Sequence, residues 1–286
     1  MTLKTSPFVK WAGGKKQLLS KLKERMPNSY LNYYEPFIGG GALLFDVQPE
    51  HAVINDTNSQ LLNCYRQLKN NYNNVINEVK LLDSVSCDKE RYYIIRDKYN
   101  KKILDNQLDA ECAALMIWIN KHCFNGLYRV NKKGLFNVPY NNKVNGPSIN
   151  EDNLRDIGLY LNNYNVDIRE GDFEDACVDV KKDDFVYFDS PYVPVTETAN
   201  FTDYTKDGFT YEDHVRLSKL YKKLDKKGAK IMLSNNDVPL VYELYGEFNI
   251  DRFNVRREIN RNANKRKGKE VIITNYSGNS LDTWFN

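Results

Sequence analysis

Four consecutive residues, Asp189-Ser190-Pro191-Tyr192, bring together a carboxylate, a turn stiffened by proline and an aromatic ring. They directly follow an apolar run over residues 184–188, which is typical of a buried β-strand. In open α/β sheets, ligands bind in the crevice beyond the carboxyl ends of the strands. The tetrapeptide is therefore a candidate ligand site, because it places an acid and a ring where the expected strand stops.

A second candidate is the glycine-rich turn Gly39-Gly40-Gly41, which we expect to join a strand to a helix. A further expected strand over residues 52–55 ends in Asp56. This order of strand, glycine turn, helix and acid-terminated strand is typical of nucleotide-binding units, in which the acid binds ribose hydroxyls. The pattern Gly-x-Gly-x-x-Gly is not met, because Leu44 stands at the third glycine position, and this disfavours a dinucleotide cofactor.

The segment Gly13-Gly14-Lys15 precedes another expected helix. Free N–H groups and the helix dipole favour an anion at such a start, although a plain turn into a helix would have the same sequence. The pattern of a P-loop is absent. The apolar face of this helix would consist of Leu18, Leu19, Leu22 and Met26.

The composition of the 286-residue chain excludes several classes of protein. Apolar residues are frequent enough for a packed core in one large domain or two smaller ones. No apolar run approaches the ~18 residues that cross a membrane, and residues 1–8 lack the apolar centre of a signal peptide. The five cysteines form no Cys-x-x-Cys pair and the three histidines have no ligand spacing. We therefore expect a cytoplasmic protein with reduced thiols, no metal and no membrane partner.

The net charge is only +3, but eight Lys and Arg residues lie between Arg252 and Lys269, opposed there only by Glu258. Such a block is either a solvated loop or an arm that contacts phosphates, since neutralising phosphates releases counterions. Both interpretations stay open from the sequence alone.

Residues 58–69 and 111–123 have helical patterns, and residues 70–110 between them interrupt the α/β alternation. This predicts an inserted, mostly helical subdomain. It ends in a segment over residues 124–140 that resembles a β-hairpin around Lys132-Lys133-Gly134. Arg and Asn side chains, which make bidentate contacts with guanine and adenine, alternate there with aromatic residues. A polar surface hairpin would have a similar composition.

The α/β pattern resumes after the insertion with a strand that ends in Asp172. Beyond the tetrapeptide we expect a loop over residues 193–210 and a helix from about Tyr211 to Gly228. A strand over residues 230–235 and a helix over residues 238–248 follow. Two last strands, over residues 249–259 and 269–276, would form an antiparallel pair, which predicts a mixed sheet.

Taken together, the chain resembles the Dam/DpnII-type DNA adenine-N6 methyltransferases of the α class. The resemblance extends over residues 8–276 and keeps the order of the family's motifs. It implies an α/β fold with the Rossmann-like mixed sheet of class I methyltransferases. Residues 1–60 and 157–286 would form the catalytic domain, and residues 61–156 an inserted, mostly helical target-recognition domain. The segments that carry it are residues 8–15, 35–42, 54–56, 124–129, 136–139, 171–173 and 189–192.

The resemblance also implies a role for individual residues, with S-adenosylmethionine (SAM) as methyl donor and double-stranded DNA as partner. The positions that match SAM contacts are Trp11, Lys15, Phe37, Gly39, Gly41, Asp56, Asp172, Phe173 and Asp189. The positions that match contacts with the DNA target, typically GATC, are Lys10, Asn125, Leu127, Arg129 and Pro139. The catalytic positions are Asp189, Ser190, Pro191 and Tyr192.

The chemistry implied for the tetrapeptide follows from the electronic structure of adenine. Its N6 lone pair is delocalised into the ring, so two acceptors that take both N–H hydrogens are needed to aim the lone pair at the methyl group. Asp189 and the main-chain carbonyl of Ser190 would be these acceptors, and Tyr192 would stack on the base. Because N6 is inaccessible inside a duplex, the base must flip out.

One residue departs from the family's pattern, since Ser190 stands where the family has proline. Serine still supplies the carbonyl but does not restrict φ, so we expect a looser turn and retained activity. The alternatives are a methyltransferase acting on cytosine N4 or a glutamine amide, and a non-catalytic DNA-binding protein whose motif has decayed.

Overall fold

The computed structural model describes residues 3–15, 18–143, 146–194, 208–256 and 267–277. Most of the predicted loop over residues 193–210, and Arg257, Arg261, Lys265 and Arg266 of the basic block, lie outside the described residues. Nothing in the described part of the chain forms a helix that is both long and apolar enough to cross a membrane. All five cysteines are free thiols.

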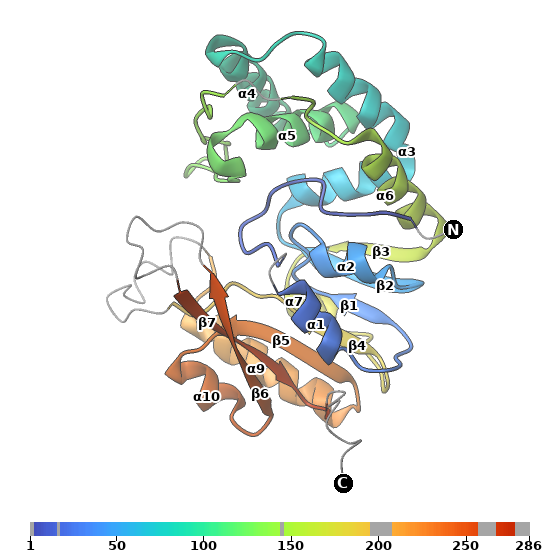
Figure 1. Ribbon diagram of the computed structural model, residues 1–286, viewed down its shortest axis with the longest axis vertical. Helices are drawn as coiled ribbons and strands as arrows, with labels where there is room; N and C mark the ends of the chain where they lie inside the picture. Colours follow the sequence, from blue (N-terminus) through green and yellow to red (C-terminus); the bar gives the residue numbers. More distant parts are fainter. Residues whose placement is uncertain (1–2, 16–17, 144–145, 195–207, 257–266, 278–286) are drawn as a thin grey trace. The chain divides into compact units, whose positions relative to one another are not determined.

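Seven strands form one mixed sheet in the order β3-β2-β1-β4-β5-β7-β6 (Figure 1). β1 is parallel to β2 and β4, and β4 is parallel to β5. β7 is antiparallel to both β5 and β6, which confirms the predicted mixed sheet. The strands are β1 (Tyr33–Glu35), β2 (His51–Asp56), β3 (Asn165–Glu170), β4 (Phe185–Phe188), β5 (Lys230–Asn236), β6 (Asn249–Arg256) and β7 (Lys267–Thr274).

The contacts of the chain divide it into two compact units. Unit 1 comprises Met1–Gly14, Ile38–Glu50 and Asn55–Glu170, and unit 2 comprises Lys15–Phe37, His51–Ile54 and Gly171–Asn286. This division concerns compactness, so the predicted functional boundaries at residues 61 and 156 remain a prediction.

Unit 1 is built mainly from helices, of which α3, α5 and α6 pack together (Figure 1). α5 is apolar on almost all sides, so its neighbours bury it on almost all sides. Its Trp118 is fully buried, and the indole Nε1 donates to Oδ1 of Asp83 at 3.0 Å. The helices of this unit are α2 (Ala42–Val47), α3 (Ser59–Asp83), α4 (Lys89–Leu104), α5 (Ala110–His122), the 3-10 turn η1 (Phe124–Gly126) and α6 (Glu151–Asn163).

The starts of these helices follow from local sequence. Asn58, Asp88, Asp109 and Asn150 are N-caps whose side chains each accept from the main-chain N–H three residues later. The predicted helix over residues 58–69 proves too short, because α3 continues to Asp83 across a non-helical residue, Asn71. Buried residues beyond that point, Val75, Ile76 and Val79, supply the packing that extends it.

Unit 2 holds the central strands and the helices α1 (Leu19–Arg25), α7 (Phe173–Ala176), α9 (Tyr211–Lys226) and α10 (Pro239–Tyr245). The four residues of β4 are all buried, as expected for a parallel strand covered on both faces. α9 and α10 pack their apolar side chains into a core shared with β4, β5 and β7. α9 begins with a capping box formed by Thr210 and Asp213.

Two element boundaries in unit 2 differ from expectation. The described part of α1 begins at Leu19, with Leu18 as its N-cap, although the sequence placed Leu18 on the apolar face of the helix. Residues 16–17, which join Lys15 to this start, lie outside the described residues, so the anion site stays a prediction. α10 ends at Tyr245 rather than Phe248, and Gly246 is its C-cap.

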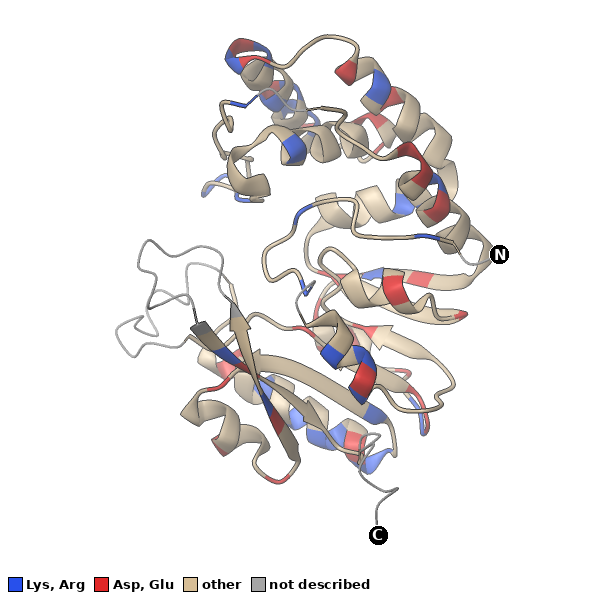
Figure 2. Cartoon of the chain, in the orientation of Figure 1, with Lys and Arg blue, Asp and Glu red and all other residues tan. Residues whose placement is uncertain are grey.

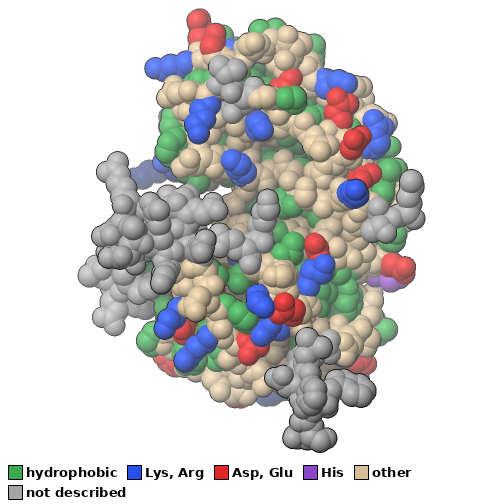
Figure 3. Space-filling view, in the orientation of Figure 1, with side chains coloured by type: hydrophobic (Ala, Val, Ile, Leu, Met, Phe, Trp, Pro, Cys, Tyr) green, Lys and Arg blue, Asp and Glu red, His purple; other side chains and the backbone are tan. Residues whose placement is uncertain are grey.

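Charged residues of both signs are interspersed along the helices of unit 1, as Figure 2 shows. On the face drawn in Figure 3, hydrophobic side chains are scattered among polar ones and form no single large patch. Of the basic block, Arg252 is engaged within unit 2, because its Nε donates to the Tyr242 hydroxyl at 2.6 Å.

Candidate functional site

The tetrapeptide begins immediately after β4, at the carboxyl end of a strand that lies between β1 and β5. The carboxylate of Asp189 meets two donors at the same oxygen, Oδ1. Lys15 Nζ lies 2.6 Å from it, and the Ser234 hydroxyl donates to it at 3.0 Å. The Lys15 and Asp189 side chains are only 8% and 19% exposed. Two of the predicted residues, Lys15 and Asp189, are therefore in direct contact.

Opposing effects act on the pKa of Asp189. Burial raises the pKa of Asp189 above its ordinary value, while the Lys15 ammonium and the Ser234 hydroxyl act to lower it. A carboxylate with two fixed donors on one oxygen keeps its plane oriented. Such a group is suited to accept further hydrogen bonds from a planar amine.

Tyr192, the last residue of the tetrapeptide, is part of the same cluster. Lys15 Nζ lies 4.5 Å from the centre of its ring, a cation–π contact. Its hydroxyl donates to Oε2 of Glu270, on β7, at 3.3 Å. Burial and the carboxylates of Asp189 and Glu270 raise the pKa of Tyr192, so it remains a neutral phenol.

Ser190 is 2% exposed, and its hydroxyl oxygen has no hydrogen-bond partner among the residues that the structure describes. The segment after the tetrapeptide is held by the end of β5. Val193 N donates to Oδ1 of Asn235 at 2.9 Å, and Nδ2 of Asn236 donates to the Val193 carbonyl at 2.6 Å. These asparagines anchor the turn from outside the motif.

Three of the predicted cofactor residues form a second cluster in unit 2. The ring of Phe37 lies 5.4 Å from that of Phe173, and both rings contact Phe209. Asp172 caps the short helix α7, because its Oδ1 accepts from Glu174 N at 2.9 Å. The cluster joins aromatic faces to a carboxylate, a combination that suits a purine with an exocyclic amine.

Arg216, on α9, adds a contact to this cluster that the sequence did not indicate. Its Nη2 donates to Oδ1 of Asp172 at 2.8 Å, and its guanidinium carbon lies 4.9 Å from the centre of the Phe173 ring. The guanidinium thus connects the acid and the ring of the Asp172–Phe173 pair.

In unit 1, Asp56 lies at the end of β2 beside the glycine turn. Its Oδ2 accepts from Gly39 N at 3.1 Å and its Oδ1 from Asn58 N at 2.9 Å. Burial raises the pKa of Asp56, and these main-chain donors oppose that effect. The predicted order of glycine turn, helix and acid-terminated strand is present. A hydrogen bond from the main chain of the turn to the Asp56 carboxylate joins the turn to the strand end.

The conformation of this turn requires glycine at two positions. Gly39 has φ +46°, and a Cβ there would lie 2.9 Å from Cδ1 of Trp11. Gly41 has φ +69°, and a Cβ there would lie 2.5 Å from the Tyr65 hydroxyl. The structure therefore brings Trp11, Gly39 and Asp56 together.

Lys10, one of the residues predicted to contact DNA, is held in unit 1 by a buried asparagine, Asn120. Its Oδ1 accepts from Lys10 N at 2.8 Å, and its Nδ2 donates to the carbonyls of Lys10 and Gly126 at 2.9 and 3.0 Å. Phe124 N donates to the Pro139 carbonyl at 2.8 Å. Asn120, which the sequence did not single out, therefore joins Lys10 to the turn over residues 124–126, and Phe124 joins that turn to Pro139.

The predicted hairpin is present as two antiparallel bridges, Cys123 with Tyr140 and Val130 with Phe136, rather than as regular strands. Leu127 and Arg129 on it are exposed. Nε of Arg129 donates to Oδ1 of Asn137 at 2.7 Å, which holds the guanidinium across the hairpin.

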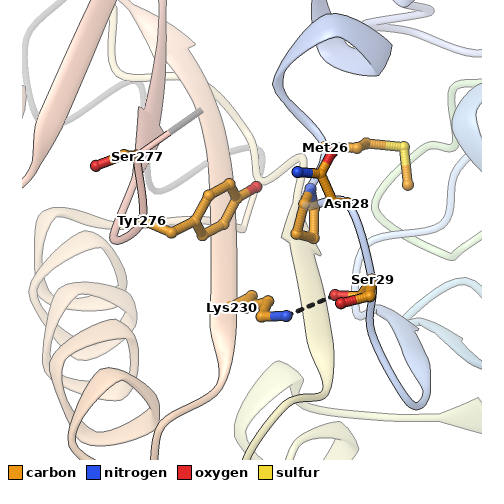
Figure 4. Close-up of a pocket in the computed structure, with 7 residues that line it drawn as sticks. Met26, Asn28, Ser29, Lys230, Tyr276 and Ser277 are labelled. Atoms are coloured by element: carbon orange, nitrogen blue, oxygen red, sulfur yellow. Dashed lines mark hydrogen bonds between the residues drawn. The ribbon is translucent and has the colours of Figure 1, made fainter. Parts of the chain in front are cut away.

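A pocket of about 290 Å³ in unit 2 contains none of the predicted residues (Figure 4). It lies at the amino end of β5, where Lys230 Nζ donates to the Ser29 carbonyl at 2.6 Å. The tetrapeptide follows the opposite, carboxyl end of β4. The pocket is lined by Met26, Pro27, Asn28, Ser29, Lys230, Tyr276 and Ser277.

Comparison with known proteins gives consistent matches over most of the chain. Residues 11–259 match the sequence pattern of a family described as D12 class N6 adenine-specific DNA methyltransferase. A type II methyltransferase of Lactococcus lactis subsp. cremoris is 45% identical over 271 residues, covering 94% of this chain and 95% of the relative. One of Methanocaldococcus jannaschii is 42% identical over 292 residues, covering 96% and 100%. The DNA adenine methylase of Escherichia coli K12 is 30% identical over 282 residues, covering 96% of each.

Proposed function

Since the chain belongs to the family of D12 class N6 adenine-specific DNA methyltransferases, we propose that it methylates N6 of an adenine flipped out of a short double-stranded DNA site, with GATC as the first site to test. SAM is the proposed donor, and it supplies the electrophilic methyl group. The observation that carries the proposal is Asp189 at the end of β4, with its Oδ1 held by Lys15 and Ser234.

The proposed reaction assigns separate tasks to residues of the tetrapeptide. Asp189 accepts one hydrogen of the N6 amine, and the main-chain carbonyl of Ser190 accepts the other. The nitrogen then becomes tetrahedral, with its lone pair directed out of the plane of the ring. When this lone pair takes the methyl group, the C–S bond of the donor would break, and the N6 hydrogen held by Asp189 would leave as a proton. Tyr192 stacks on the base and offsets part of the few kcal/mol that flipping costs. The neutral phenol of Tyr192, held by Glu270, supports this stacking role.

The residues assigned to SAM have the chemistry that its binding requires. Asp56 offers carboxylate oxygens for ribose hydroxyls, beside a glycine turn that allows close approach of the main chain. Phe37 and Phe173 offer aromatic faces for adenine, and Asp172 offers an acceptor for its amine. The remaining positions assigned to SAM are Trp11, Lys15, Gly39, Gly41 and Asp189.

Target recognition is assigned to residues 61–156, and catalysis to residues 1–60 and 157–286. The positions that read the DNA are Lys10, Asn125, Leu127, Arg129 and Pro139. The exposure of Leu127 and Arg129, and the joining of Lys10 to the 124–126 turn by Asn120, support this assignment. The proposed setting is the cytoplasm, on chromosomal or phage DNA.

The proposal is tested by incubating the purified chain with SAM and duplexes that differ only in a GATC site, followed by mass analysis of the nucleosides. N6-methyladenine confined to the GATC duplex is the expected product. N4-methylcytosine as the product would contradict the proposal and identify a methyltransferase that acts on cytosine N4. Binding of SAM and duplex DNA without transfer would identify a non-catalytic DNA-binding protein. Mapping methylated adenines in cells that express the chain would then define the site.

A further inference from the structure

Ser234 is a fully buried serine in a strand whose other residues pack against the core. Its hydroxyl faces side chains on and just after the neighbouring strand β4, and it also acts on the hydroxyl of Tyr192. It donates to Oδ1 of Asp189 at 3.0 Å, and it lies 3.1 Å from the hydroxyl of Tyr187. Tyr187 and Asp189 are two residues apart, so the alternation of an extended chain places them on the same face of the sheet. Tyr187 is paired with Met232 of β5, and Ser234, two residues after Met232, lies on that face as well.

The number of available protons gives this chain of hydroxyls a direction. A serine hydroxyl has one hydrogen to donate, and Ser234 donates it to the carboxylate. The hydrogen between Ser234 and Tyr187 must therefore come from the tyrosine. Burial and the charge of Asp189 raise the pKa of Tyr187 well above its ordinary value, so its hydrogen is retained. The order is Tyr187 to Ser234 to Asp189.

From this geometry we infer that Ser234, supported by Tyr187, is a positioning residue for the methyl-transfer reaction. Ser234 and Lys15 both act on Oδ1 of Asp189, and this assigns the other oxygen, Oδ2, to the N6 hydrogen of the substrate. The inference rests on the proposed function, since it assigns the orientation of the acceptor in that reaction.

The charged and titratable groups around Asp189 come from several elements. Lys15 precedes α1, Tyr187 belongs to β4, and Tyr192 follows β4. Glu270 on β7 contacts Tyr192, and Glu35 on β1 acts on Tyr187. Among the described residues, Lys15 and Ser234 donate to the carboxylate, so loss of the serine hydroxyl removes one of the two donors that stabilise its charged form.

The test compares Ser234→Ala with Ser218→Ala in the full chain. Ser218 is a matched control, because it is also buried but donates to the Val215 carbonyl within α9. We expect Ser234→Ala to lower kcat about 10- to 100-fold, the size of one hydrogen bond to a charged group. The KM for SAM should change little. Ser218→Ala should keep the wild-type kcat.

If Ser234 had only a structural role, the dependence of kcat on pH would stay unchanged in Ser234→Ala. The pH profile of kcat therefore distinguishes a structural role from a positioning role. Without the hydroxyl the charged form of Asp189 loses a donor, and the acid limb of kcat should move to higher pH. Tyr187→Phe should shift it in the same direction by less. In the Ser234→Ala background Tyr187→Phe should have no further effect on the limb, since its contact acts through the serine.

Two results would overturn the inference. One is a wild-type kcat and acid limb in Ser234→Ala, and the other is an equal effect of Tyr187→Phe with and without Ser234. If Ser234→Ala fails to fold, Tyr187→Phe alone decides, through a shifted or unshifted limb. Failure of the proposed function is a separate result, because the wild-type chain would then produce no N6-methyladenine.

Discussion

Lys15 Nζ lies 2.6 Å from Oδ1 of Asp189, and both side chains are largely withdrawn from water. The two residues are far apart in sequence and belong to different predicted motifs. Their contact connects the Gly13-Gly14-Lys15 segment with the tetrapeptide. A charge pair with this little exposure depends on both partners, because removal of one leaves the other buried without its opposite charge.

Lys15→Ala should therefore destabilise the protein by about 2 kcal/mol at neutral pH. The folded-state pKa of Asp189 is already raised above its ordinary value, and it should rise further in the variant. The folded protein then binds the proton more tightly than the unfolded chain, so the variant regains stability as pH falls through the folded pKa. Urea unfolding over a pH series measures this. Lys21→Ala, in the exposed pair with Glu24, should cost less than about 1 kcal/mol at every pH.

Asp189→Ala and Asp189→Asn should lower methyl transfer by about 10²-fold or more, because each removes an acceptor that acts on the amine. Duplex binding should remain close to wild type, since the positions proposed to read the DNA lie elsewhere. Tritium transfer and a gel-shift titration measure the two properties. Wild-type rates in either variant would contradict the mechanism.

The hydroxyl of Ser190 should be dispensable. It is buried with no partner among the described residues, so Ser190→Ala should keep activity and gain about 1 kcal/mol of stability. Ser190→Pro should keep the carbonyl, stiffen the turn and leave kcat equal or higher. An inactive Ser190→Ala would mean that the side chain itself takes part in the reaction. If the wild type is inactive and Ser190→Pro restores transfer, the departure from proline is disabling.

Arg129→Ala should relax specificity at one base position by about 1–3 kcal/mol. Asn137→Ala should have a smaller effect in the same direction, because Asn137 holds the guanidinium of Arg129. Competition binding with a set of singly substituted duplexes measures both. An equal loss of affinity on every sequence, with a reduced salt dependence, would make Arg129 a phosphate contact instead.

Gly39→Ala should weaken SAM binding and cost about 1–3 kcal/mol of stability, because its φ is positive and a Cβ would press on the Trp11 ring. Gly40→Ala is the matched control, since its Cβ would meet Trp11 Cβ at an ordinary 3.5 Å. Isothermal titration with SAM should show full affinity for Gly40→Ala. Equal SAM affinities in the two variants would show that the glycine turn does not contribute to SAM binding.

Local sequence determined much of the fold and the motifs of the candidate site. The apolar run Phe185–Phe188 predicted a buried strand, and the structure buries all four residues. Asp56 and Asp189 were predicted at strand ends, and both occur there. These features depend on neighbouring residues, on turn chemistry and on the twofold alternation of strands, all of which can be read along the chain.

Only the tertiary structure decided which distant side chains complete these motifs. Ser234 reaches Asp189 because β5 is the parallel neighbour of β4, and Glu270 reaches Tyr192 from an antiparallel strand. Asn120 joins Lys10 to Gly126, and Arg216 reaches Asp172 from a helix. Serine, asparagine and arginine are common residues with no spacing rule, so their roles depend on strand order and helix packing. The sequence by itself determined the motifs of the candidate site, and the packing of strands and helices decided which side chains hold them.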